Sequence, residues 1–276
     1  MSQSFSFLSN KQEFYAQKWE ASNSRAVMCL VHGHGEHIGR SDRVADFLKG
    51  AGINTLGFDL YGHGKTKFKK GHWPSYEAVM DSIAVLIDEA KKQYPGKPVF
   101  LYGHSLGGNL AVNFALRRKP KVAGLILSAP WLKLAFDPSS TDLFLAKMML
   151  NIYPSFTQSS KLDATAISRD PKEVEKYVND PLVHDLISPQ MFTTARQAGL
   201  WALEHAGELE LPLLLFHGDA DRLTSFAASE VFAAKAGGGA VSFHPFEGYF
   251  HELHNEAKEH RDPILNLMKD WMGERI

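Results

Sequence analysis

Short apolar runs alternate with longer helical patterns over most of this 276-residue chain. The runs are rich in β-branched and aromatic residues, as in AVMCLVH at 26–32 and INTLGFD at 53–59. Strand–helix alternation predicts a parallel sheet with helices on both faces. The runs are apolar throughout rather than on every second residue, which fits strands buried on both sides. We therefore predict an α/β fold with a mostly parallel, twisted central sheet, and further strands at 99–103, 122–130, 211–218 and 240–248.

Two segments depart from this alternation. SFSFLS and FYAQKWEA, near the start, predict an opening hairpin. From Trp131 to about Gly207 the chain has helical patterns and several prolines but no convincing strand. Because this stretch lies between two core strands, we expect a helical cap at 131–207, inserted into a core of 1–130 and 208–276.

Charge and cysteine content limit the partners and the location. The formal net charge is −1, so no overall attraction to nucleic acid is expected. The single cysteine, Cys29, lies in an apolar run and excludes an intramolecular disulfide. The first residues do not resemble a secretory signal, and no apolar run is long enough to span a membrane. We expect a cytoplasmic protein, in contact with membranes at most peripherally.

The strongest chemical motif is G-H-S-L-G at 103–107. It directly follows the predicted strand VFLY and opens a helical pattern that continues to about Arg118. A serine in a sharp strand–turn–helix connection is typical of a hydrolase nucleophile, and the flanking glycines allow neighbouring backbone to approach closely. We predict that Ser105 is a catalytic nucleophile.

A serine hydroxyl needs a base, and that base needs an orienting acid. In folds with this motif the acid and then the histidine follow the serine along the chain. Asp219 and Asp221 both lie just past the strand at 211–218, where α/β sheets build their sites. His251 and His254 both follow the last strand. The residue pattern alone leaves both choices open.

The segment HGHGEH at 32–37 permits two interpretations. Its spacing is close to H-x-H-x-D-H, which supplies ligands to binuclear metal sites. It is also close to the His-Gly turn that supplies a backbone donor to an oxyanion hole. A glutamate stands where the metal motif has aspartate, and a metal site would leave the serine motif unexplained.

These motifs together resemble the monoacylglycerol lipase and lysophospholipase-like family of the α/β-hydrolase superfamily. HGHGEHIGR, FDLYGHGKT, GHSLGG, NDPLV, HGDADRLT and GYFHELHNE follow the family's order over nearly the whole chain. The resemblance implies an α/β-hydrolase fold and selects Asp221 as acid and His251 as base. It also implies that the backbone N–H groups of His34 and Leu106 form the oxyanion hole, with no cofactor or metal.

The resemblance also implies a polar pocket for the alcohol part of the substrate, lined by Glu36, Arg40, Tyr177 and His254. An internal salt bridge between Glu36 and Arg40 that fixes the oxyanion turn is an equal and compatible interpretation.

The predicted cap contains a weakly polar stretch at 141–156. Leu145 and Met148, with Met149 and Ile152, recur at helical spacing, which is typical of packing against a core. The functional alternative is an acyl-binding tunnel whose outer lip touches lipid surfaces. The four lysines of GHGKTKFKKGHW at 62–73 are expected to be a solvated loop, with a phosphate-attracting patch as the alternative.

We therefore predict a serine carboxylic-ester hydrolase, and most specifically a monoacylglycerol lipase. A lysophospholipase or a general carboxylesterase is the alternative. A ligand-binding protein with slow turnover is a more distant one. The expected partner is a lipid or small ester substrate, with transient membrane contact through the cap.

Overall fold

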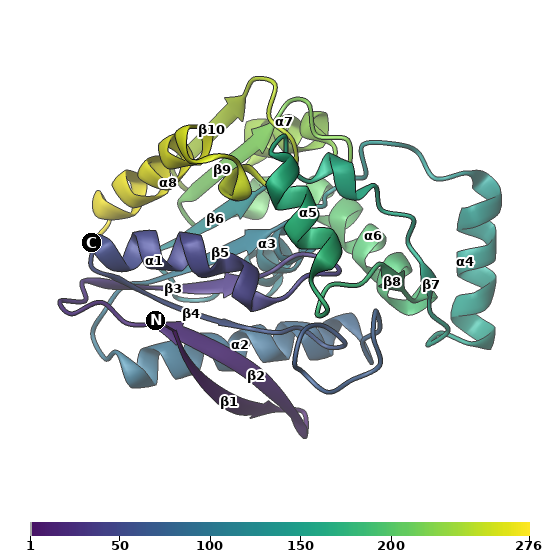
Figure 1. Cartoon of the computed structure of the whole chain (residues 1–276), viewed down its shortest axis with the longest axis horizontal. Helices are drawn as coiled ribbons and strands as arrows, with labels where there is room; N and C mark the ends of the chain where they lie inside the picture. Colours follow the sequence, from purple (N-terminus) through teal and green to yellow (C-terminus); the bar gives the residue numbers. More distant parts are fainter. Residues whose placement is uncertain (1) are drawn as a thin grey trace.

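The computed structural model describes residues 2–276 and contains an eight-stranded sheet with the order β1-β2-β4-β3-β5-β6-β9-β10 (Figure 1). The opening hairpin is antiparallel and joins the sheet through an antiparallel pairing of β2 with β4. All other pairings within this sheet are parallel, as predicted. The strands are β1 (Gln3–Ser9), β2 (Gln12–Trp19), β3 (Ala26–Val31), β4 (Ile53–Phe58), β5 (Val99–His104), β6 (Gly124–Ser128), β9 (Leu213–Gly218) and β10 (Val241–Phe246).

Helices cover both faces of the sheet. One hydrophobic cluster packs α2 and α3 against one face, and a second packs α1 and α8 against the other (Figure 1). Every residue of β3, β4, β5, β6 and β9 is buried, which explains their continuous apolar sequences. The core helices are α1 (Asp42–Gly50), α2 (Tyr76–Gln93), α3 (Leu106–Arg118), α7 (Phe226–Lys235) and α8 (Lys258–Gly273).

The segment between β6 and β9 is mainly helical. Pro171 and Pro189 occupy the first turns of its helices α5 and α6, where a missing N–H costs nothing. The prediction that this segment holds no strand is wrong, because β7 and β8 form a short antiparallel pair. Two residues are too few to produce an alternating pattern. The elements are α4 (Ser140–Ile152), β7 (Gln158–Ser159), α5 (Pro171–Asn179), β8 (Leu186–Ile187) and α6 (Pro189–Glu204).

Two helices of this segment differ sharply in burial. Much of α6 is buried against α3, and the Asn109 side chain donates to the carbonyls of Trp131 and Ala195. In contrast, α4 contains no buried residue, and its main contact is with α6. It stands at the outer edge of the molecule (Figure 1). The expectation that its apolar residues pack against the core is therefore wrong. Within residues 2–276, no helix is both long enough and apolar enough to cross a membrane.

Candidate active site

Ser105 lies between β5 and α3 in a strained turn. Its φ of 53° falls in the left-handed region that side chains other than glycine rarely adopt. A Cβ atom on Gly103 would lie 2.3 Å from the carbonyl oxygen of Gly107, and one on Gly107 would lie 2.0 Å from that of Val31. Both glycines are therefore needed to close the turn. The fold places Ser105 at the carboxyl end of a central strand, with only 9% of the residue exposed.

Asp221 follows β9, and both of its carboxylate oxygens are engaged. Oδ2 lies 2.6 Å from Nδ1 of His251 and 3.0 Å from Nε2 of His217. Oδ1 accepts the backbone N–H groups of Leu223 at 2.7 Å and Thr224 at 3.1 Å. Because an ionised carboxylate only accepts, this contact places the His251 proton on Nδ1 and leaves Nε2 free to act as a base.

The buried pair of Asp221 and His251 favours the charged form of the Asp221 carboxylate. Burial alone would raise the pKa of Asp221, but the charge of His251 and the hydrogen bonds from both histidines hold it far below its usual value. Burial alone would lower the pKa of His251, but the charge of Asp221 and its hydrogen bond raise it. An imidazolium formed during a reaction would thus be stabilised where it arises.

The geometry distinguishes Asp221 from Asp219, a choice that the residue pattern left open, and shows where His251 lies. Asp219 is exposed, and its Oδ1 accepts the backbone N–H of Gly248 at 2.6 Å. The ring of His251 lies 4.7 Å from that of His104, the residue before Ser105. His251 therefore bridges the neighbourhood of the serine to Asp221, whereas Asp219 belongs to a surface turn.

Sequence reasoning missed His217, at the end of β9. The ring is completely buried, with Nδ1 lying 2.8 Å from Oγ of Ser229 and Nε2 on Asp221. A hydroxyl can donate to Nδ1 while Nε2 donates to the carboxylate, so His217 helps to fix the Asp221 side chain. Its position four residues before Asp221, at the end of a core strand, was the available signal.

The turn after β3 packs directly on Ser105. A Cβ atom on Gly33 would lie 3.1 Å from Cβ of Ser105. The N–H of Gly33 donates to Oε1 of Glu36 at 2.6 Å, which holds the turn closed. His34 follows immediately in this turn, and Leu106 is the first residue of α3, where a backbone N–H has no partner within its helix. The two backbones predicted to form an oxyanion hole thus flank the serine in the fold.

The three histidines of HGHGEH do not converge. Nε2 of His32 accepts the N–H of Leu60, while Nε2 of His37 lies 2.9 Å from Asp180. Both ring nitrogens of His34 are buried without a partner, and burial lowers its pKa to about 3. No group of three or more histidine, cysteine or acidic side chains within residues 2–276 is arranged to hold a metal ion. The three rings therefore have different partners: His32 accepts a backbone N–H, His37 contacts a carboxylate, and His34 packs against the ring of His63 with 5.7 Å between the centroids.

A buried ion network connects the oxyanion turn to the segment that carries His251. Arg40 donates to Glu36 at 3.0 Å and to both oxygens of Glu252, at 2.6 and 2.7 Å. Its guanidinium also lies over the ring of Tyr177, 4.7 Å from the centroid. The predicted Glu36–Arg40 salt bridge is thus present. Sequence reasoning missed Glu252, although it directly follows the predicted base.

The remaining predicted substrate contacts separate into two groups. His254 is buried, its ring lies 4.7 Å from that of His104, and its Nδ1 has no partner. Burial lowers its pKa to about 4. Leu145 and Met148 instead lie on α4, where they are 45% and 40% exposed. The structure brings His254 beside His104, the residue before Ser105, but leaves the two cap residues at the surface.

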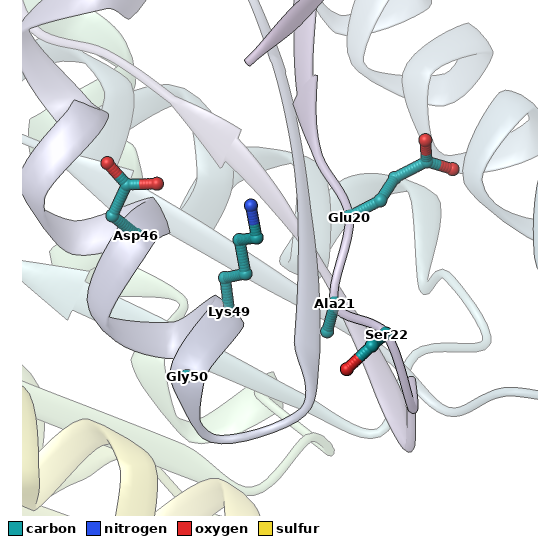
Figure 2. A pocket seen from close by; sticks show the side chains of 6 residues that line it. All are labelled: Glu20, Ala21, Ser22, Asp46, Lys49 and Gly50. Atoms are coloured by element: carbon teal, nitrogen blue, oxygen red, sulfur yellow. The ribbon is translucent and has the colours of Figure 1, made fainter. Parts of the chain in front are cut away.

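A shallow depression lies at the opposite end of the sheet from these residues (Figure 2). Its walls come from the end of β2 and the end of α1, beside the amino ends of β3 and β4. Because Ser105 lies at a carboxyl end, this depression is not part of the candidate site. The lining residues are Glu20, Ala21, Ser22, Asp46, Lys49 and Gly50.

Comparison with known proteins agrees with the fold and the motifs. A model of the hydrolase family described as serine aminopeptidase, S33 matches residues 22–258. The chain belongs to this family. It is 34% identical to an uncharacterized abhydrolase domain-containing protein of Dictyostelium discoideum, over 91% of this chain and 26% of that protein. It is 30% identical to the monoglyceride lipase of Mus musculus, over 96% of this chain and 88% of that protein.

A solved structure extends this likeness. The crystal structure of Paleococcus ferrophilus monoacylglycerol lipase superimposes with a TM-score of 0.88 at 32% identity, over 95% of this chain and 99% of that chain. The predicted α/β-hydrolase fold and the resemblance to monoacylglycerol lipases are therefore confirmed.

Proposed function

We propose that this protein is a monoacylglycerol lipase that uses Ser105 as nucleophile, His251 as base and Asp221 as acid. The observation that carries the triad is the 2.6 Å contact between Asp221 and Nδ1 of His251, beside the strained serine turn. The substrate class is supported by the similarity to proteins named monoglyceride lipase and monoacylglycerol lipase.

The reaction proceeds through an acyl-enzyme. Ser105 Oγ attacks the ester carbonyl while Nε2 of His251 takes the hydroxyl proton. The backbone N–H groups of His34 and Leu106 donate to the oxyanion of the tetrahedral intermediate. The intermediate collapses, the C–O bond to the alcohol breaks, and His251 gives its proton to the departing glycerol oxygen. Water then attacks the acyl-enzyme by the same route and releases the fatty acid.

The glycerol part of the substrate would meet polar groups beside the oxyanion turn. The hydroxyl of Tyr177 would lie 3.4 Å from a Cβ atom on Gly35, and Nδ1 of His254 has no hydrogen-bond partner among residues 2–276. Both are suited to substrate hydroxyls. Glu36 and Arg40 act on the substrate less directly, because their main partners are each other, Gly33 and Glu252.

The acyl part would reach the enzyme through the cap. Leu145 and Met148 belong to an exposed apolar helix rather than to the buried core. Exposed apolar patches of this kind typically mark contact with lipids or other apolar partners. We propose that α4 meets the lipid surface from which the substrate is drawn.

An aminopeptidase function, which the family description suggests, is less favoured by the site. An aminopeptidase must bind a substrate ammonium group, for which an unpaired carboxylate is the natural partner. Glu36 and Glu252 both pair with Arg40, and Asp221 is occupied by two histidines.

The test is hydrolysis of a matched panel by the purified protein: 2-monoacylglycerols, lysophosphatidylcholine, p-nitrophenyl esters and an aminoacyl anilide. We expect monoacylglycerol to be preferred. Ser105→Ala should lower turnover by about 10⁶-fold while leaving the circular dichroism spectrum unchanged. Preference for lysophosphatidylcholine would make the protein a lysophospholipase. Saturable ligand binding without multiple turnovers would instead make it a binding protein.

A further inference from the structure

The loop between β4 and α2 presents a concentrated positive charge. We call residues 62–73 the lysine loop, because Lys65, Lys67, Lys69 and Lys70 are all exposed there and the loop contains no acidic residue. None of the four forms an ion pair with a carboxylate within residues 2–276. The formal net charge of the chain is only −1, so this patch is a local feature.

Backbone hydrogen bonds hold the lysine loop in place. The N–H of Gly71 donates to the carbonyl of Gly62 at 3.3 Å, and that of His72 donates to the carbonyl of Lys69 at 3.2 Å. The N–H of Ser188, at the start of α6, donates to the carbonyl of Gly71 at 2.8 Å. The loop is thereby attached to the segment between β6 and β9, and its charges are displayed at a fixed position.

The neighbouring segment is largely apolar and contains no acidic residue of its own. We call residues 143–161 the apolar arm; it comprises most of α4 and the chain that follows it to the end of β7 and just beyond. Phe144 is 66% exposed and Ile152 is 70% exposed. The only charged residues of the arm are Lys147 and Lys161.

A direct contact joins the two surfaces. Nζ of Lys69 lies 5.1 Å from the centre of the Tyr153 ring, just past the end of α4. Figure 1 shows the loop between β4 and α2 on the same side of the molecule as the lower end of α4. The nearby exposed carboxylate of Asp185 accepts a hydrogen bond from Oγ of Ser159. The result is one continuous surface of exposed apolar side chains and lysines, with Asp185 as an exposed carboxylate beside it. Nζ of Lys65 also donates to the hydroxyl of Tyr15 at 3.3 Å.

We propose that the lysine loop and the apolar arm together form a docking surface for anionic lipid membranes. Exposed apolar side chains beside lysines are the combination by which proteins lie on such membranes, with the apolar groups among the acyl chains and the ammonium groups at the phosphates. This proposal rests on the proposed function, because a lipid ester must be taken from such a surface. It adds that the charge of the surface decides where the enzyme works.

The experiment compares vesicle binding by the full chain and two matched variants. One carries glutamine at Lys65, Lys67, Lys69 and Lys70. The control carries glutamine at four other exposed lysines, Lys91, Lys92, Lys97 and Lys121, at the end of α2 and near the amino ends of β5 and β6. Both variants lose the same formal charge. Binding is measured by flotation with phosphatidylcholine vesicles and with vesicles that also contain phosphatidylglycerol.

We expect the wild-type chain to prefer the phosphatidylglycerol vesicles, and high salt to remove that preference. Each of the four lysines near an anionic surface contributes roughly a fivefold factor, so the loop variant should bind about 600-fold more weakly. The control variant should bind like the wild type. Equal binding to both kinds of vesicle, or equal losses in the two variants, would overturn the proposal.

Hydrolysis of p-nitrophenyl butyrate in solution tests the esterase function independently of the membrane-docking proposal. This ester needs no membrane, so the loop variant should hydrolyse it at the wild-type rate. A wild-type chain without any esterase activity would refute the lipase function, whereas an active chain without phosphatidylglycerol preference would refute the docking surface alone.

Discussion

At the scale of single residues, two aspartates separated by one position differ completely in environment. Asp221 is buried and contacts two histidines, while Asp219 is exposed in a turn. We expect Asp221→Asn to lower kcat/KM by about 10⁴-fold, because the amide no longer fixes the imidazole or stabilises its cation. Asp219→Asn should retain nearly full activity. Steady-state kinetics of the two variants decides the assignment, and the reverse ranking would transfer the acid to Asp219.

Glu252 is expected to influence the base through charge as well as position. Burial alone would raise its pKa, but Arg40 holds it at about 2, so Glu252 is a carboxylate directly beside His251. Glu252→Gln should therefore lower the pKa of His251. Since the base acts when neutral, the acid limb of kcat/KM should move to lower pH.

The acid limb of the pH profile also depends on the other charged or titratable groups around His251, which are retained in the Glu252→Gln variant. They are Asp221, His217, His104, His254, Glu36 and Arg40. Glu256→Gln is the control, because Glu256 is equally buried and pairs with Arg169 without touching Arg40. A merely structural role for Glu252 would lower the rate in Glu252→Gln and leave its pH profile like that of the control.

At the scale of secondary-structure elements, Asn109 joins α3 to α6. Its amide donates to the carbonyls of Trp131 and Ala195, and its Oδ1 accepts the hydroxyl of Tyr76 at 2.7 Å. Asn109→Ala should reduce the free energy of unfolding by about 2–4 kcal/mol, because three buried polar groups lose a partner. Urea denaturation measures this change. Asn151→Ala on exposed α4 is the control and should change stability by less than about 0.5 kcal/mol.

At the scale of the whole molecule, buried neutral histidines make stability sensitive to acid. Burial lowers the pKa of His32 and His34 to about 3 and that of His254 to about 4, and it places those of His63 and His104 well below 6.5. His34 is partly exposed as a residue, but its ring nitrogens are buried. All five side chains take up a proton more readily when the chain is unfolded.

The sign of this effect follows from proton uptake. Above the unfolded pKa of 6.5 neither state binds these protons, so their contribution to stability is fully present there. As the pH falls below 6.5 the unfolded chain binds them first, and stability falls by about 1 kcal/mol per pH unit for each histidine. His251, whose pKa is raised, acts in the opposite sense. Urea midpoints should therefore fall steeply between about pH 7 and pH 5; a flat profile would contradict the buried neutral state.

Much of the fold follows from the sequence because the relevant signals are local. The apolar strands, the helix that begins at Leu106 and the glycines around Ser105 each express a conformation that a few neighbouring residues determine. The bulk of the fold and the strained turn at Ser105 could therefore be predicted from residue patterns. The choice of Asp221 and His251 needed more: the pattern left both pairs open, and the family resemblance selected between them.

Tertiary structure decided whatever depends on residues far apart in the chain. Arg40 and Glu252 are separated by 212 positions, yet they form a bidentate pair at the site. The apolar residues of α4 have the spacing of a core helix, but their exposure depends on whether another element covers them. Likewise, the sequence does not show that the lysine loop lies beside the apolar arm. The fold brings Lys69 over the ring of Tyr153 and so joins the two surfaces. Local sequence sets backbone conformation, whereas burial and charge pairing arise only when distant segments meet.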